Sequence, residues 1–261
     1  MKEKKLTREV IVEALVNALE PLDYVHAFYE GGAAAFNRID EWSDIDLYLV
    51  VDDDKVDSTF LATEKALESL SPIKSKLKTP QLPWPGVFQT FYQLENASEF
   101  LLIDLAVLQL SASEKFLEPS VHGKVVFYFN KNDMLKPTPF DKEAFPEKLR
   151  GRLEMLQTRF SIFNSLVQKE INRGNTLEAI EWYHTFTLTA LVEALRIMYN
   201  PIHHDFRMRY VHYELPPEAI KKLEDLYFVK NARDLQGKFD KATKWFQETL
   251  SKIDPSLWSL E

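Results

Sequence analysis

Residues 29–51 read YEGGAAAFNRIDEWSDIDLYLVV, and they carry the strongest structural signal of the chain. A β-prone run over 24–29 leads into a Gly-Gly pair at 31–32, and a second such run over 44–51 opens with Asp-Ile-Asp. Runs rich in β-branched and aromatic residues, bounded by glycines and polar residues, are typical of strands. The stretch therefore predicts two strands that are separated by a glycine turn and a short linker.

Asp44 and Asp46 share one face of the second strand, because side chains alternate along a strand. Two carboxylates on one half-buried face repel each other and are costly to desolvate unless a cation lies between them. Magnesium prefers oxygen ligands and often bridges to substrate phosphates, so the pair predicts a site for one or two such ions. A third acid, Asp104, stands in the apolar run 100–110. If that run pairs beside 44–51, the three acids converge on one metal cluster.

The glycine turn supplies hydrogen-bond donors for an anion, which the carboxylates cannot provide. Without side chains, Gly31 and Gly32 let backbone N–H groups approach an anion closely. A helix beginning near residues 33–36 would place its N-terminus, which favours negative charge, at the same point. We therefore expect a polyphosphate to lie between the glycines and the metal.

This arrangement resembles the DNA polymerase beta-type nucleotidyltransferase superfamily, in which a strand ends at a glycine turn and an Asp-x-Asp strand and a later strand acid follow. The length of the chain, the SDIDL wording of 43–47 and a helical C-terminal half are similar to the enzymes that adenylylate aminoglycoside and lincosamide antibiotics. The motif-level match covers about residues 24–110. The likeness of the C-terminal half is one of architecture.

The resemblance implies roles for individual residues. Asp44 and Asp46 become metal ligands that also orient the nucleoside triphosphate, and Asp104 becomes the third carboxylate. Gly31 and Gly32 become the turn that contacts phosphate. All three acids are thereby also candidate catalytic residues.

Two further residues match the family's pattern as candidates for binding the nucleotide. Ser43 corresponds to a frequent Ser-Asp start, and Arg38 falls where many members carry a basic residue. A surface position is the alternative for Arg38. The sequence departs from the family at Gly32, because the second turn position is often Ser.

The activity that the resemblance implies is transfer of a nucleoside monophosphate, AMP in the adenylylating group. A hydroxyl of a small-molecule acceptor attacks the α-phosphate of ATP or another nucleoside triphosphate, and pyrophosphate leaves. Two Mg²⁺ ions are the expected cofactors. Positioning and charge neutralisation would supply most of the catalysis. Asp104, or a glutamate of the helical half such as Glu181, would take the hydroxyl proton.

Composition excludes several other classes of function. The net charge is −8, and residues 1–135 hold 13 Lys and Arg against 22 Asp and Glu, whereas the rest of the chain holds 19 against 18. A general nucleic-acid binder needs a basic face, which this balance does not favour. The absence of cysteine excludes disulfides, thiolate zinc sites and a cysteine nucleophile. No apolar stretch approaches the roughly 20 residues that span a bilayer, and the N-terminus lacks a signal-peptide core, so we expect a cytoplasmic protein with no membrane partner.

Prolines over 135–146 place a domain boundary near residue 140. The predicted organisation is an α/β nucleotidyltransferase-like domain with a mixed sheet over 1–140 and an all-helical bundle over 141–261. The helical domain would close a cleft and select the acceptor, and the residues leave open whether it forms a homodimer. The element prediction places helices over 7–20, 55–70, 146–172, 176–199 and 216–250, and further strands over 87–94, 100–110 and 124–129.

Two other functions remain as alternatives. One is an antitoxin-type enzyme that transfers AMP to a protein, and the other is a nucleotide-binding regulatory protein without catalysis.

The acidic run 52–54 is interpreted as a solvated turn. The segment 199–213, rich in histidine, arginine and aromatic residues, is interpreted as a loop at a substrate or at a domain boundary. Glu193 and Arg196, three residues apart on a predicted helix, are interpreted as a surface ion pair.

Overall fold

The computed structural model describes residues 6–254 and 258. Contacts between Cα atoms divide the chain into two compact units, Met1–Phe140 and Asp141–Glu261. The first unit contains a six-stranded mixed sheet with helices, and the described part of the second contains helices and connecting loops. The predicted fold class, an α/β domain followed by a helical region, is therefore confirmed.

The sheet has the strand order β3-β4-β5-β2-β1-β6. All neighbouring strands are antiparallel except β2 and β5, which are parallel. A parallel pair needs a crossover connection, and here the chain passes through helix α3 (Val56–Leu70), β3 and β4 between the two strands. The N-terminal ends of β2 and β5 therefore lie side by side at the same end of the sheet. The strands are β1 (Val25–Glu30), β2 (Ile45–Val51), β3 (Ile73–Lys78), β4 (Val87–Leu94), β5 (Ile103–Gln109) and β6 (Val126–Asn130).

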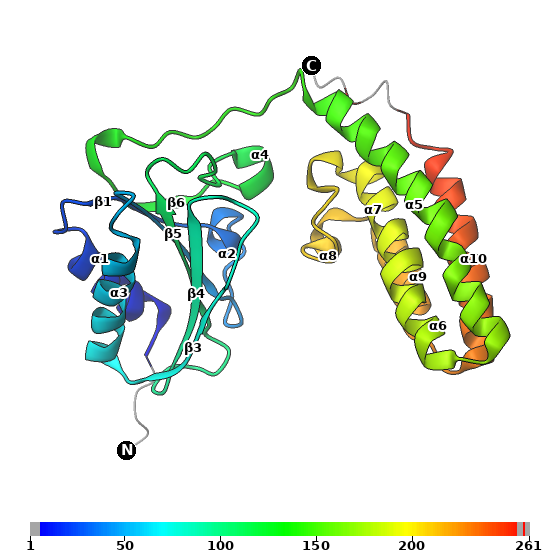
Figure 1. Ribbon diagram of the computed structural model, residues 1–261, viewed down its shortest axis with the longest axis horizontal. Helices are drawn as coiled ribbons and strands as arrows, with labels where there is room; N and C mark the ends of the chain where they lie inside the picture. The colour runs from blue at the N-terminus through cyan, green and yellow to red at the C-terminus, as the bar shows by residue number, and fades with distance from the viewer. Residues whose placement is uncertain (1–5, 255–257, 259–261) are drawn as a thin grey trace. The chain divides into compact units, whose positions relative to one another are not determined.

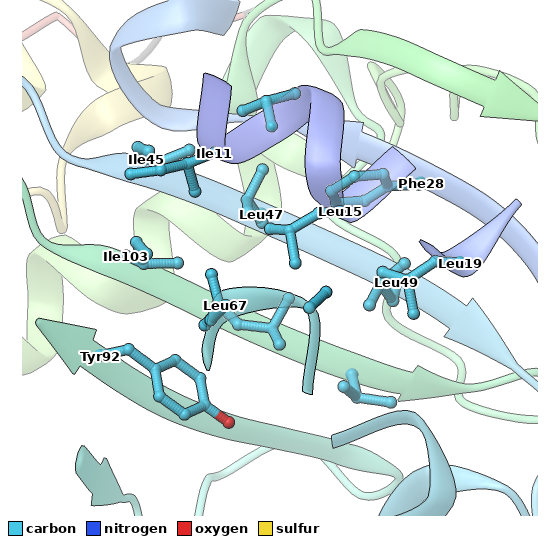
Figure 2. Packing of buried hydrophobic residues seen from close by; sticks show 14 of the residues in the cluster. Ile11, Leu15, Leu19, Phe28, Ile45, Leu47, Leu49, Leu67, Tyr92 and Ile103 are labelled. Carbon is cyan, nitrogen blue, oxygen red and sulfur yellow. The ribbon is translucent and has the colours of Figure 1, made fainter. Parts of the chain in front are cut away.

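Two helices, α1 (Arg8–Leu19) and α3 (Val56–Leu70), pack on one face of the sheet (Figure 1). Ile11, Leu15 and Leu19 of α1 lie against Leu47 and Leu49 of β2 (Figure 2). These five side chains are at most 1% exposed. Since strand side chains alternate, the even-numbered positions of β2 face the other way.

The opposite face of the sheet carries a second, aromatic cluster. Tyr29 and Tyr48 stack with ring centroids 5.2 Å apart, and Phe116 lies 5.5 Å from the Tyr48 ring. The short helices α2 (Gly32–Ala35) and α4 (Pro119–His122) also belong to this unit, and a 3₁₀ turn at Lys131–Asp133 follows β6. This is the face on which the even-numbered side chains of β2 and β5 lie.

Strand β3 forms one edge of the sheet and was not among the predicted strands. Its residues after Ile73 are all exposed, and three of its six residues are lysines. Lys76 pairs with Glu64 of α3 at 2.5 Å, and Lys78 lies 3.7 Å from Asp57 of the same helix. A strand without a buried face gives no hydrophobic alternation, so the sequence pattern did not reveal it.

The second unit is built around the long helix α5 (Phe145–Arg173). Phe160 of α5 stacks on Phe246 of α10 with ring centroids 3.8 Å apart. The remaining helical elements are α6 (Thr176–Trp182), a π-helical segment (Tyr183–Leu188), α7 (Thr189–Tyr199), a 3₁₀ turn (Pro201–His203), α8 (Val211–Glu214), α9 (Pro217–Tyr227) and α10 (Ala232–Leu250). No helix in the described ranges combines the length and the apolar character needed to cross a membrane.

The predicted helices of this unit need two corrections. The run 176–199 is continuous but contains the π-helical segment, and the run 216–250 is two helices separated at 228–231. Asn231 caps α10, because its side chain accepts a hydrogen bond from the backbone N–H of Asp234 at 3.0 Å. This cap satisfies a free N–H at a new helix start.

Candidate active site

The parallel pairing of β2 with β5 brings two of the predicted carboxylates side by side. Asp46 and Asp104 are register partners in this pair. Neighbouring strands lie about 4.8 Å apart, and partners in register project from the same face. Asp44 stands one residue before β2, where the N–H of Ile45 donates to the carbonyl of Leu102 at 2.9 Å. The three acids therefore gather where β2 and β5 begin.

The carboxyl group of Asp104 lies in a half-buried, negatively charged environment. Burial raises its pKa to about 6, and the charges of Asp46 and Asp44 add to this increase. Gln89 of β4 opposes the increase, because its Nε2 donates to both carboxylate oxygens at 2.7 and 3.0 Å. Burial also raises the pKa of Asp44, against the positive charge of Arg8. Asp46 and Asp44 are therefore close enough to Asp104 to disfavour its ionised form.

This raised pKa predicts a pH dependence of stability. An acid whose pKa is higher in the folded state stabilises the fold below its unfolded pKa, and this contribution is lost as the pH rises through the folded value. Without added metal, the contribution of Asp104 to the free energy of unfolding should therefore fall by an amount on the order of 2 kcal/mol between about pH 4 and 6. Asp104→Asn should remove this fall. Urea unfolding of both proteins from pH 4 to 7 measures it.

The control for this prediction is Asp57→Asn, which removes one charge from a side chain that is 91% exposed. It should retain the wild-type pH profile. An unchanged profile in Asp104→Asn would show that Asp104 does not titrate in this range.

The glycine turn lies directly against the Asp46 carboxylate. A Cβ atom at Gly32 would stand 1.7 Å from Oδ2 of Asp46, and Gly32 has a φ of +52°. At Gly31, a Cβ would stand 2.8 Å from Cε2 of Tyr48, and the Gly31 N–H donates to the Asp46 carbonyl at 2.9 Å. At Gly32 both the left-handed φ and the Asp46 carboxylate favour glycine, whereas at Gly31 a Cβ atom would require the Tyr48 ring to shift. The following helix α2 is a single turn of four residues, so its dipole is small.

The other two predicted nucleotide-binding residues lie in the loop between α2 and β2. The Ser43 hydroxyl donates to Oδ1 of Asp40 at 2.8 Å and accepts from the Asp40 N–H at 2.9 Å. The Arg38 guanidinium lies over the Phe36 ring, 5.1 Å from its centroid. Ser43 thus shapes the turn that leads to Asp44. Phosphate contacts by either residue remain predictions.

Three residues outside the sequence motifs support the carboxylates. Arg8 of α1 forms an ion pair with Glu30 at the end of β1 and donates to the backbone carbonyl of Asp44. Glu30 is 3% exposed and also accepts from the Tyr128 hydroxyl. Gln89 holds Asp104 as described. An acid between an apolar strand and the glycine turn was a usable sequence signal for Glu30. Nothing in the spacing of the sequence indicated Arg8 or Gln89.

The predicted base Glu181 lies on α6 in the second unit. Its side chain is exposed and accepts a hydrogen bond from the Thr185 hydroxyl at 3.2 Å. Its role in proton transfer remains a prediction. The expected surface pair between Glu193 and Arg196 is wrong, because Glu193 pairs with Arg152 and the fully buried Arg196 pairs with Glu214 at 2.6 Å.

The donor set suits magnesium in its chemistry, since the three side chains offer hard carboxylate oxygens. Within residues 6–254 and 258, however, no three His, Cys, Asp or Glu side chains are arranged to hold a metal ion by themselves. Magnesium is usually bound by one or two carboxylates together with water and substrate phosphates, and not by a complete protein cage. The adjacent pair Asp46 and Asp104 fits that partial ligand set.

The first unit has a mixed sheet, paired acids on two parallel strands and a glycine turn beside them. The nucleotidyltransferase resemblance predicts this arrangement. Among solved structures, a crystal structure of an aminoglycoside 6-adenyltransferase from Bacillus subtilis is similar to this chain. The two share 14% sequence identity over 98% of this chain and 93% of that one, with a TM-score of 0.40. No family model and no curated protein matches the chain. The likeness is distant and identifies no site residue of this chain.

Proposed function

We propose that the first unit is the catalytic domain of a nucleotidyltransferase. The protein would transfer AMP, or another nucleoside monophosphate, from a nucleoside triphosphate to a hydroxyl of a small-molecule acceptor. The observation that carries the proposal is the pairing of Asp46 with Asp104 on adjacent parallel strands, with Gly32 packed against the Asp46 carboxylate. Two half-buried acids held together in this way favour a cation as the third partner.

Asp46 and Asp104 would hold magnesium together with substrate phosphates, and Asp44, just before β2, stays a predicted ligand beside them. When bound, the metal would neutralise charge on the triphosphate and on the departing pyrophosphate. The rigid register of β2 and β5 fixes two of these side chains before any ligand arrives. Such preorganisation lowers the cost of assembling the charged site.

Asp104 is the proposed acceptor of the hydroxyl proton. The acceptor oxygen forms a bond to the α-phosphorus, the bond from this phosphorus to the bridging oxygen of the β-phosphate breaks, and pyrophosphate leaves with those electrons. The proton passes to an oxygen of Asp104. Gln89 orients this carboxylate.

The glycine turn would approach the triphosphate with its backbone. The Gly31 N–H already donates to the backbone carbonyl of Asp46. Backbone contact with phosphate would therefore come from Gly32 and the residues after it. Because Gly32 has no side chain, it also leaves room for the Asp46 carboxylate in its present position.

The test is release of pyrophosphate from each of the four common nucleoside triphosphates with magnesium. A panel of aminoglycosides, lincosamides and simple polyols serves as acceptors. Acceptor-dependent release by the wild-type protein, abolished in Asp44→Asn/Asp46→Asn, is the expected result. Release that persists in this double variant would contradict the proposed site.

A second experiment separates small-molecule from protein acceptors. The protein is incubated with labelled ATP and a cell lysate, and the products are resolved by size. Label in a small product supports the proposal, whereas a labelled protein band favours transfer of AMP to a protein. Magnesium-dependent ATP binding without any transfer would favour a regulatory protein that has no catalysis.

A further inference from the structure

The second unit contains a cavity of about 300 Å³. It lies between α5, the π-helical segment, α7 and the loop that follows the 3₁₀ turn Pro201–His203. Its volume is at the small end of the range of ligand pockets, which is roughly 300–1,000 Å³. All of its lining residues belong to residues 152–207, so the cavity is complete within this unit.

The lining of this cavity carries more positive than negative groups. Three arginines, Arg152, Arg159 and Arg207, line it together with the acids Glu193 and Asp205. Arg152 makes a two-pronged ion pair with Glu193, with Nη2 2.8 Å from Oε2, so these two charges cancel. In the part of the chain that the structure describes, the guanidinium groups of Arg159 and Arg207 form no ion pair. A single acid, Asp205, therefore stands against two uncompensated arginines and His204.

A buried network fixes the loop that presents Arg207. Arg196 is fully buried, and its Nε donates to the backbone carbonyl of Arg207 at 2.7 Å. Arg196 also pairs with Glu214, whose other oxygen lies 2.8 Å from Nδ1 of His203. Arg207 has a φ of +52°, a left-handed conformation that is unfavourable for a residue with a side chain. Such a conformation persists where the surrounding structure imposes it.

The remaining wall of the cavity is apolar and is shaped by the π-helical segment. Phe186 of this segment lines the cavity, and its ring stacks on Phe163 and Trp182 at centroid distances of 5.2 Å. Leu156 and Phe160 of α5 also line it. In a π-helix each backbone hydrogen bond spans one residue more than in an α-helix, and such segments are frequent at functional sites.

From this combination we infer that the cavity binds a small molecule with a carboxylate or phosphate group on an apolar or aromatic body. The planar guanidinium groups of Arg159 and Arg207 would hold the anion, since arginine matches the geometry of both groups. Phe186 and Leu156 would contact the apolar body. Polycations, including aminoglycosides, would be repelled by the same arginines.

The experiment measures binding of four matched probes by ligand-observed NMR and calorimetry, without nucleotide or magnesium. The probes are phenyl phosphate, phenylacetate, the neutral phenylacetamide and the cationic phenethylamine. The expected result is that at least one anion binds more than about tenfold tighter than the amide and the amine. Because no transfer reaction is involved, failure here is distinct from failure of the proposed function.

Variants place the binding in this cavity. Arg159→Gln/Arg207→Gln should weaken anion binding at least about tenfold, and Thr185→Trp should block the cavity sterically. Thr185, Arg159 and Arg207 are all exposed, so these variants should fold, which circular dichroism checks. Arg150→Gln is the matched control, because Arg150 lies on the same helix outside the lining. Equal binding of the anions and the amide, no binding of either anion, or an equal loss in Arg150→Gln would overturn the inference.

Discussion

Replacing Asp46 with asparagine should lower nucleotidyl transfer by more than about 100-fold while leaving the protein folded. Even partners one step removed from a metal ligand are typically worth 10–100-fold, so loss of a proposed ligand should cost more. The amide keeps the shape of the side chain beside Gly32 but removes its charge. The measurement is kcat/KM for acceptor-dependent release of pyrophosphate at saturating magnesium.

The same substitution has a second readout that does not depend on activity. The charge of Asp46 helps to raise the pKa of Asp104, so Asp46→Asn should move that pKa down, towards its ordinary value. The pH range over which the folded protein loses stability should shift to lower pH accordingly. Asp57→Asn is the matched control for both measurements. A folded Asp46→Asn protein with near wild-type activity would remove Asp46 from the proposed machinery.

Gly32→Ala should both destabilise the first unit and reduce activity. The new methyl group would stand 1.7 Å from Oδ2 and 2.4 Å from Cγ of Asp46, so the carboxylate must move. The left-handed φ of +52° adds a cost of about 1–2 kcal/mol for a residue with a Cβ atom. We expect a loss of about 1–3 kcal/mol in the free energy of unfolding and at least about tenfold in kcat/KM. Urea unfolding and the pyrophosphate assay measure the two effects.

Gly237 offers a matched control for this substitution. It lies within α10, and a Cβ atom there would meet nothing within 4 Å. Gly237→Ala should stabilise the helical unit by about 0.5–1 kcal/mol without changing activity. A double-mutant cycle then isolates the clash, because Gly32→Ala should cost less in an Asp46→Ala background, where Oδ2 and Cγ are absent. Equal costs in both backgrounds would contradict a steric role for Asp46.

The sequence was sufficient to predict the carboxylate face, because alternation along a strand is a local property. It placed Asp44 and Asp46 on one face and marked Asp104 as an acid that needed a partner. Which strand lies beside which is a non-local property, so the sequence predicts that Asp46 and Asp104 meet only if their two strands are neighbours. The structure satisfies that condition and adds Gln89 from a third strand.

What the sequence did not reveal depends on contacts between distant segments. Arg8 and Glu30 are 22 positions apart, and no spacing rule links a helix start to a strand end. Arg196 looked like a partner for Glu193 because they share a helix face, yet burial and the loop carbonyls gave it other partners. Tertiary contacts of this kind override local pattern, since a buried charge must be fully hydrogen-bonded wherever its partners are.

The lysines of β3 affect whether copies of the protein can associate through the edge of the sheet. An open sheet edge exposes unpaired N–H and C=O groups, which invite a strand from another molecule to extend the sheet. At this edge, Lys76 and Lys78 turn towards acids of α3. A strand added alongside would have to cover these ammonium groups and strip away their water. The edge is thereby protected against open-ended sheet growth at high protein concentration.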